Sequence, residues 1–372
     1  RRLLEVDFPE LHSKVKEAPT TNTALRGRSR LLANSARDAE HLAHGMAQAL
    51  QDNDQSSLLV VHEGTLLSPD ALIFFAQLEP LLNEDPTIWC IGTSNHAGLA
   101  PYAADLTALF RTDYHPAGHA WMMKNDILQE LLQKWPGSEW ERFIQLDQVR
   151  LGRHCVIPEV SRSRMAGPPA SDDPTLRRGE RSIFDEFHQT IFWNKDMPMV
   201  HLGDVTRMTE QSYDNLLLHT WPKDQGLAKS EPITPRQLAE VTNGNHHLVL
   251  EDRHGSWSKV TSFFRLPSSK DMRLPSSYKG HLRLRWRGGV VHLLQWNSPF
   301  LTVADIPKQT PKRGQDFPLP PVLRAPTVAV VVGHTGQSCD VACRQTTQTS
   351  RCHEEDLLFL NGCSALRGIL GQ

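Results

Sequence analysis

The sequence predicts an α/β fold followed by a smaller β-rich region. Two short apolar segments, Ser57–Val61 and Ile88–Gly92, are typical of buried strands, and residues 71–82 between them have the spacing of an amphipathic helix. Polar residues follow each strand, at His62-Glu63-Gly64 and in a turn around Asn95. Because α/β sheets bind ligands at the carboxyl ends of their strands, these two points predict the position of a functional site.

The helices have recognisable signals of their own. Apolar residues recur along residues 36–50 with the spacing of one helix face, which predicts a helix before the first strand. The helix over residues 71–82 follows Ser68-Pro69-Asp70, where Ser68 is the expected N-cap, Pro69 suits the first turn and Asp70 is an early carboxylate.

The second half of the chain changes in character after Trp221-Pro222. Short apolar runs separated by Pro, Ser and Gly predict strands at residues 248–251, 263–266, 282–286 and 290–296. Prolines then gather in a segment that predicts a semi-rigid linker. The expected organisation is therefore an α/β domain, a β-rich domain, a linker and a Cys-rich module, at residues 1–223, 224–304, 305–330 and 331–372.

Composition excludes several classes of protein. The 372 residues contain 39% hydrophobic and 22% charged residues, which suits a globular protein of two or three domains. A formal net charge of −2 gives no electrostatic indication of nucleic acid as a partner. The chain starts with Arg1 and has no apolar run of about 18 residues, so we expect any membrane anchor to lie outside it.

Six cysteines are distributed unevenly. Cys90 and Cys155 stand alone, whereas the other four crowd the last 35 residues, at Cys339, Cys343, Cys352 and Cys363. Their spacing does not match a zinc site, and an even number of cysteines with a dense cluster favours disulfides and an oxidising compartment. The four terminal cysteines allow three pairings, among which the sequence does not choose.

Trp140-Glu141 is the dipeptide with the clearest chemical use. An indole gives a sugar ring an apolar wall, and a neighbouring carboxylate can take a proton from a hydroxyl held there. Spacing alone favours the alternative, in which Trp140 is a structural aromatic residue and Glu141 a solvated charge. Hydrolysis by paired carboxylates is less well supported, because nothing in the sequence places Asp147 and Glu141 across a glycosidic bond.

A series of segments, spread in a fixed order over most of the chain, supports the chemical role of Trp140-Glu141. The segments are Leu59-Val60-Val61, Ser68-Pro69-Asp70, Trp89-Cys90-Ile91, Phe110-Arg111-Thr112-Asp113, Lys134-Trp135-Pro136, Gly152-Arg153 and Cys155 through Arg162. Through them, roughly residues 39–300 resemble the family of N-acetylglucosaminyltransferase I and the protein O-mannose β-1,2-N-acetylglucosaminyltransferase. The Cys-rich end separately resembles the corresponding end of N-acetylglucosaminyltransferase V.

The resemblance implies a fold, an activity and a location. It implies a GT-A domain, Rossmann-like, that binds UDP-GlcNAc and transfers GlcNAc with inversion to a mannose hydroxyl of a glycoprotein in the Golgi. By alignment Glu141 falls on the catalytic carboxylate, Trp140 on an acceptor-side tryptophan and His41 on a histidine that contacts the donor diphosphate. Cys90 and Cys155 fall on a family disulfide.

The main departure from the family is His62-Glu63-Gly64. At this place the family has an acidic motif whose last aspartate holds Mn²⁺, and Gly64 has no oxygen to offer. His62 or Glu63 is then the candidate metal ligand, since Mn²⁺ accepts oxygen and imidazole ligands, and Glu63 is also a candidate donor-binding residue. Alternatively, Arg177, Arg178 and Arg181 replace the metal, since guanidinium groups match phosphate oxygens; the structural alternative for them is a solvated basic loop.

The same departure supports a second functional class. A strand that binds uracil in the family is not recognisable in residues 1–35. Together with Gly64, this favours a catalytically inactive GT-A protein that acts as a carbohydrate-binding module, because a fold does not by itself carry a function. Transferase and binding module are therefore both kept as hypotheses.

Overall fold

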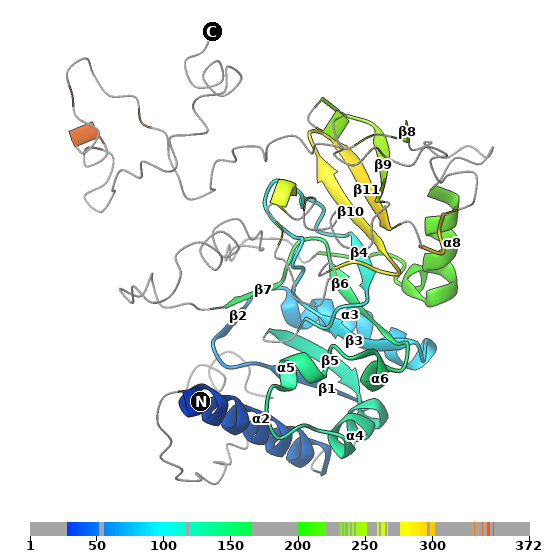
Figure 1. Ribbon diagram of the computed structural model, residues 1–372. Helices are drawn as coiled ribbons and strands as arrows, with labels where there is room; N and C mark the ends of the chain where they lie inside the picture. Colours follow the sequence, from blue (N-terminus) through cyan, green and yellow to red (C-terminus); the bar gives the residue numbers. More distant parts are fainter. Residues whose placement is uncertain are drawn as a thin grey trace. The chain divides into compact units, whose positions relative to one another are not determined.

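The computed structural model describes residues 28–51, 56–116, 119–165 and 200–220, most of 231–301 and a few residues between 331 and 345 (Figure 1). The chain divides into two compact units. The first takes its described residues from the segments up to Val60 and from Met123 to Leu151, and the second takes the remainder. Two of the boundaries between the units fall inside strands, one in β1 (Ser57–Val61) and one in β5 (Ala120–Lys124).

The first unit is mainly helical. Helix α2 contains the predicted helix but begins eight residues before it, and it buries Ala39 and Met46. α2 packs against α4, which buries Ile127, Leu128 and Leu131 along one face. The elements of this unit are α2 (Arg28–Gln51), β1 (Ser57–Val61), α4 (Asn125–Gln133), α5 (Trp140–Phe143) and α6 (Asp147–Arg150).

A five-stranded sheet with the order β1-β5-β3-β6-β4 is the framework of the α/β part. β3 and β6 run parallel, whereas β5 and β4 are antiparallel to their neighbours β3 and β6. α3 packs against β3, and a separate antiparallel pair is formed by β2 and β7. The remaining elements here are β2 (Thr65–Leu67), α3 (Ala71–Glu84), β3 (Ile88–Gly92), β4 (Leu109–Thr112), β6 (His154–Pro158) and β7 (Ser163–Met165).

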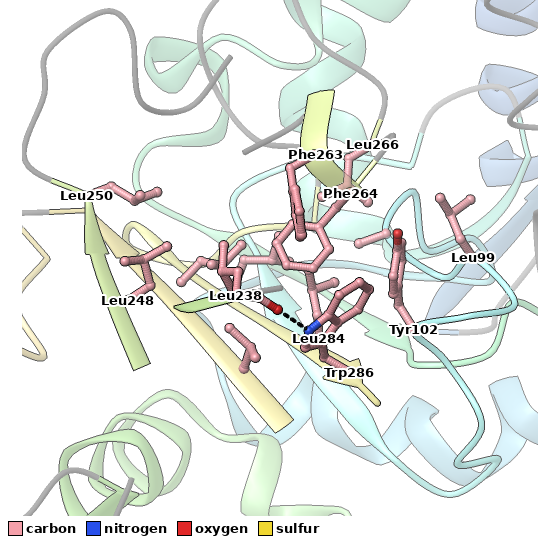
Figure 2. Close-up of a cluster of buried hydrophobic side chains, with 14 residues drawn as sticks. Leu99, Tyr102, Leu238, Leu248, Leu250, Phe263, Phe264, Leu266, Leu284 and Trp286 are labelled. Atoms are coloured by element: carbon pink, nitrogen blue, oxygen red, sulfur yellow. Dashed lines mark hydrogen bonds between the residues drawn. The ribbon is translucent and has the colours of Figure 1, made fainter. Parts of the chain in front are cut away.

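The second unit also contains the predicted β-rich region. Its sheet has the order β10-β11-β9-β8 and follows the short helix η1 and helix α8. Aromatic residues fill its core, where the Trp286 indole donates a hydrogen bond of 2.8 Å to the Leu238 carbonyl (Figure 2). The elements are η1 (Thr206–Met208), α8 (Glu210–Thr220), β8 (Glu231–Pro232), β9 (Asn245–Leu250), β10 (His281–Trp286) and β11 (Gly289–Gln295).

One predicted strand is wrong. Residues 262–264 are helical, although residues 263–266 were expected to be extended. Phe263 and Phe264 are both buried, and their rings pack edge to face against Trp286 with centroids 5.6 and 5.2 Å away. Because a short apolar run is buried equally well as a helical turn or as a strand, its periodicity did not decide between them.

The start of α3 also differs from the prediction. Asp70, not Ser68, is the residue before the first helical turn. The Ser68 hydroxyl donates a hydrogen bond of 2.5 Å to one Asp70 carboxylate oxygen, and Arg162 donates to the other at 3.3 Å. Ser68 therefore orients the carboxylate instead of capping the helix.

The other expected elements are present. β1 and β3 have the predicted bounds, α3 covers the predicted helix, and β9, β10 and β11 overlap the three remaining predicted strands. The linker and most of the Cys-rich module lie outside the described residues, and the expected domain boundaries stay a prediction. None of the described helices has the length and apolar character needed to cross a membrane.

Candidate active site

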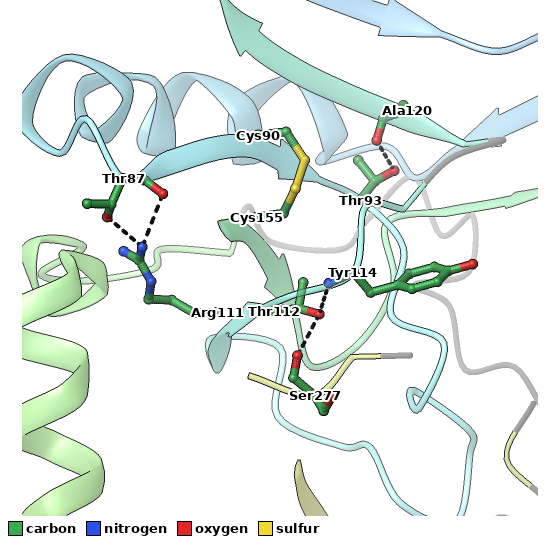
Figure 3. The surroundings of a disulfide bond; sticks show 9 residues. All are labelled: Thr87, Cys90, Thr93, Arg111, Thr112, Tyr114, Ala120, Cys155 and Ser277. Carbon is green, nitrogen blue, oxygen red and sulfur yellow. Dashed lines mark hydrogen bonds between the residues drawn. A yellow bond between two sulfur atoms is a disulfide. The ribbon is translucent and has the colours of Figure 1, made fainter. Parts of the chain in front are cut away.

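Three strands of the second unit contribute to a hydrogen-bonded relay. The Thr93 hydroxyl, just after β3, donates to the Ala120 carbonyl at 2.9 Å (Figure 3). It therefore accepts from the Ser163 hydroxyl at 2.6 Å, and Ser163 in turn accepts from His119 Nδ1 at 3.1 Å. This order of donors places the imidazole proton of His119 on Nδ1.

The β1–β2 connection passes directly beside this relay. The His62 amide donates to the His119 carbonyl at 3.0 Å, and the Thr65 amide closes the turn on the His62 carbonyl at 3.1 Å. Gly64 has a φ of 75°, whereas Glu63 has an ordinary negative φ, which identifies a type II turn. Glycine is the preferred residue at that third position, so Gly64 fits the geometry of the backbone.

The rim of the sheet, formed by the β1–β2 turn and the relay, carries few charged groups. Burial, and then the charge of His62, lower the pKa of His119 to about 4, so its ring is neutral at neutral and mildly acid pH. Glu63 is exposed at the tip of the turn and His62 is partly exposed. The turn thus presents the His62 imidazole and the Glu63 carboxylate, and the neutral His119 ring is buried beside it.

The neighbouring strand ends form a second polar layer. The Asn95 backbone amide donates a hydrogen bond to Ser161 Oγ at 2.9 Å, and the Asn95 side-chain amide donates to the Glu159 carbonyl at 2.9 Å. A Cβ at Gly98 would lie 2.9 Å from the carbonyl oxygens of both Asn95 and Glu159. The turn predicted around Asn95 and Gly98 is confirmed, and the close approach explains the glycine.

Glu159 joins this rim to the C-terminal sheet. Its side chain is only 2% exposed, and its carboxylate accepts hydrogen bonds from Arg283 at 2.7 Å and Arg285 at 2.5 Å. The amides of Ala104 and Asp105 each donate to it at 2.9 Å. A buried carboxylate with four donors holds strands β6 and β10 in a fixed relation.

The first unit positions the residues expected to act on the acceptor. Trp140 stacks on Trp135 with ring centroids 5.8 Å apart and is 3% exposed, so its ring belongs to the core of this unit. Glu141, the next residue of α5, is exposed. Successive helical residues point about 100° apart, so burial of Trp140 directs the Glu141 carboxylate outward.

His41 is presented by the same unit. The Trp135 indole donates a hydrogen bond of 2.9 Å to the Ala39 carbonyl of α2, and His41 follows two residues later on an exposed position. The Glu139 amide, just before α5, bonds Ser35 Oγ of α2 at 2.8 Å. Two separate contacts thus fix α5 to the helix that carries His41.

Cys90 and Cys155 form a disulfide between the parallel strands β3 and β6, as the resemblance implies (Figure 3). The His115 imidazole lies within 4.8 Å of both sulfur atoms. Since both sulfurs are in the disulfide, this group does not offer thiolate ligands to a metal.

Manganese does not fit the turn at residues 62–64. Mn²⁺ prefers several carboxylate, carbonyl and water oxygens, and this turn offers Glu63 as its one carboxylate. Within the described part of the chain, the one group of three potential metal ligands is Cys90, His115 and Cys155 at the disulfide. These residues are not the oxygen ligands that Mn²⁺ prefers. Gly64 also has the backbone conformation least suited to a side chain.

The structure does not describe some of the predicted site residues, and it reveals others that were not predicted. Arg177, Arg178 and Arg181 lie outside the described residues. The relay of Thr93, His119 and Ser163 was not predicted from the sequence, because its members come from three strands and have no characteristic spacing. The contacts of Glu159 were missed for the same reason.

Comparison with known proteins identifies relatives of this chain. The model of the GNT-I family matches residues 9–293. The chain is also similar to the alpha-1,3-mannosyl-glycoprotein 2-beta-N-acetylglucosaminyltransferase of Arabidopsis thaliana, with 29% identity over 133 residues. That match covers 36% of this chain and 30% of the Arabidopsis protein. The matched stretch therefore spans less than a third of the relative's length.

Proposed function

The chain belongs to the GNT-I family, and on that premise we propose that it is an inverting glycosyltransferase of the secretory pathway. Its donor is UDP-GlcNAc, and its acceptor is a mannose hydroxyl of a glycoprotein glycan, to which it adds GlcNAc in β-1,2 linkage. Its place of action is the Golgi. The printed name of the Arabidopsis relative supports this choice of donor sugar and acceptor.

The observation that carries the proposal is the placement of Glu141. Its carboxylate is exposed at the start of α5, and the stacked pair of Trp135 and Trp140 fixes the helix beneath it. A general base needs such a fixed position, because a displacement of about 1 Å can reduce a rate about 100-fold. Trp140 acts here through its support of Glu141, because its ring is buried against Trp135.

The reaction follows from these roles. Glu141 accepts the proton of the mannose hydroxyl as its oxygen attacks the anomeric carbon of GlcNAc from the side opposite the diphosphate. The bond between that carbon and the phosphate oxygen breaks, and its electron pair leaves with UDP. His41 hydrogen-bonds the donor diphosphate. Direct displacement of this kind inverts the anomeric centre and gives a β-linked product.

The product identifies the activity. Purified full chain is incubated with UDP-GlcNAc and an α-mannoside, and the product is analysed by mass spectrometry and by NMR of the new anomeric proton. We expect a mass increase of one N-acetylhexosamine and the large vicinal coupling of a β-linkage. An α-linked product, or UDP-GlcNAc hydrolysis without transfer, would contradict the proposal.

A carbohydrate-binding module without catalysis is the second candidate. The replacement of the metal-binding aspartate by Gly64 favours it. Separate calorimetric titrations with UDP-GlcNAc and with a mannose-terminated glycan distinguish the two. A module binds the glycan and not the nucleotide sugar, whereas the transferase binds both.

A further inference from the structure

The β1–β2 turn favours glycine at residue 64 because of its backbone conformation. A type II turn with Gly64 at φ 75° requires a left-handed residue where the family has its metal ligand. A residue with a Cβ costs about 1 kcal/mol or more in that conformation. Gly64 therefore lacks the carboxylate and also suits the backbone conformation of this turn.

An arginine lies beside this turn. Arg164 is the middle residue of β7, and it pairs with Leu66 of β2, two residues beyond Gly64. Directly opposite residues in an antiparallel pair have Cα atoms about 4.5–5.5 Å apart, so the long side chain of Arg164 has the turn within its reach. Arg164 is exposed, whereas its neighbours Arg162 and Ser163 are buried.

Arg162, the other arginine of this segment, has a structural role. Arg162 donates to Asp70 at 3.3 Å and to the Val160 carbonyl at 2.7 Å, and its guanidinium is fully buried. It is thus part of the support of α3. Ser163 points into the relay with His119, and alternation along a strand places Arg164 on the opposite face of β7.

We propose that this chain binds the diphosphate of its nucleotide sugar without a divalent cation, and that Arg164 supplies positive charge beside the β1–β2 turn. The inference rests on the proposed function and specifies how its donor site works. A guanidinium keeps its charge at every relevant pH and matches two phosphate oxygens at once. During transfer it stabilises the negative charge that the departing UDP acquires.

Glu63 distinguishes this arrangement from a metal site. A carboxylate that binds Mn²⁺ helps to hold a diphosphate, so its removal weakens binding. A carboxylate beside a diphosphate without a cation repels it, so its removal strengthens binding. The change Glu63→Gln, which keeps the shape and removes the charge, therefore has opposite effects in the two cases.

The first experiment is calorimetric titration of the full chain with UDP, once in EDTA and once in excess MnCl₂. We expect dissociation constants that agree within about twofold, and for Glu63→Gln a dissociation constant lowered at least twofold in EDTA. Binding that needs Mn²⁺, or weaker binding by Glu63→Gln, overturns the inference and leaves the proposed transferase intact. Absence of UDP binding under both conditions overturns both.

Arg164 is tested with matched variants in the same titration. Arg164→Gln is expected to raise the dissociation constant about tenfold or more, and Arg164→Lys, which keeps the charge and loses the fork, to raise it less. Arg287→Gln is the control, because Arg287 is an exposed arginine at the β10–β11 turn. Equal affinities for wild type and Arg164→Gln would disprove the role of Arg164.

A last pair of variants tests the turn itself. Gly64→Asp restores the missing carboxylate, and Gly64→Asn has the same shape without charge; both residues tolerate the left-handed conformation better than most. We expect Mn²⁺ to tighten UDP binding by Gly64→Asp and to have no effect on Gly64→Asn or wild type. Tightening by Mn²⁺ in wild type contradicts the inference.

Discussion

Arg111 connects three parts of the second unit through one side chain with no exposed surface. Its guanidinium donates to Asp85 at 2.8 Å, to the Thr87 hydroxyl at 2.7 Å and to the Met208 carbonyl at 2.9 Å. Burial raises the pKa of Asp85, but hydrogen bonds from Thr87, Glu210 and Arg111 together lower it below its usual value. The Asp85 carboxylate is therefore ionised in the folded protein at neutral pH.

Removal of one partner of this pair is expected to be costly. Asp85→Ala leaves a buried guanidinium without its carboxylate, and we expect a loss of roughly 3 kcal/mol in the free energy of unfolding, measured by urea denaturation. Glu130→Ala, which removes the exposed helical pair with Lys134, is the control and should cost less than about 0.5 kcal/mol. Equal losses in the two variants would contradict the importance of burial.

Gly64 provides a second test at the residue scale. Gly64→Ala places a Cβ on a residue with φ 75°, and we expect it to lower the free energy of unfolding by about 1 kcal/mol. Gly137→Ala is the matched control, because a Cβ at Gly137 meets nothing within 4 Å. A Gly64 variant as stable as the Gly137 variant would show that the turn is not held in the left-handed conformation.

At the scale of elements, the sequence is most informative about strands with clear ends. β1 and β3 have the predicted bounds, because buried apolar runs are followed directly by polar turns. Their partners were not predictable: β3 lies between β5 and β6, which come later in the chain, and β5 runs antiparallel to it. Pairing depends on contacts between distant segments, which local patterns do not encode.

Helical and extended runs are harder to separate when both are fully buried. The predicted strand at residues 263–266 is partly helical, because Phe263 and Phe264 fill the core in that conformation (Figure 2). α2 begins earlier than its apolar spacing indicates. For Phe263 and Phe264, tertiary packing, and not the local pattern, decides the outcome.

Strands β10 and β11 contain a buried histidine pair that makes the sheet sensitive to acid. His281 Nε2 and His292 Nδ1 are 2.9 Å apart. Burial, and then Arg283, lower the pKa of His281 to about 3, and burial, His281, Arg283 and His247 hold that of His292 well below its usual value. Both rings are therefore neutral in the folded protein at mildly acid pH.

The sign of the pH dependence follows from these pKa values. Below about pH 6.5 the unfolded chain binds protons that the folded chain does not, so stability falls as the pH is lowered toward the folded pKa values. Each histidine is expected to contribute a slope of up to about 1.4 kcal/mol per pH unit. Denaturation midpoints between pH 7 and 5 should fall less steeply for His281→Gln/His292→Gln than for wild type; parallel curves would contradict this.

At the scale of the whole molecule, the disulfide between Cys90 and Cys155 closes a long loop of the chain. Cys90 and Cys155 are 65 residues apart in the sequence. The double variant Cys90→Ala/Cys155→Ala is expected to lose about 4 kcal/mol in the free energy of unfolding, because the unfolded chain regains the entropy of that loop. Urea denaturation of both proteins measures the loss, and a change below about 1 kcal/mol would contradict the account.

The candidate site could be predicted only in part. The resemblance assigns roles to His41 and Glu141, which the structure places on the first unit, and to Glu63, which it places on the second. The relay of His119 and the four donors to Glu159 became visible only in the structure. Contacts between residues that are distant in the chain and share no motif cannot be predicted from a single sequence.

The rate of UDP release in the presence of UDP-GlcNAc and an α-mannoside, compared between wild type and Glu141→Gln, tests the central claim most directly. If Glu141 is the general base, wild type releases UDP in an acceptor-dependent manner and Glu141→Gln lowers kcat about 100-fold or more. Glu139→Gln, the neighbouring exposed carboxylate, should retain the wild-type rate within about twofold. Acceptor-dependent release at the same rate in wild type and Glu141→Gln, or no release by wild type, would contradict the account.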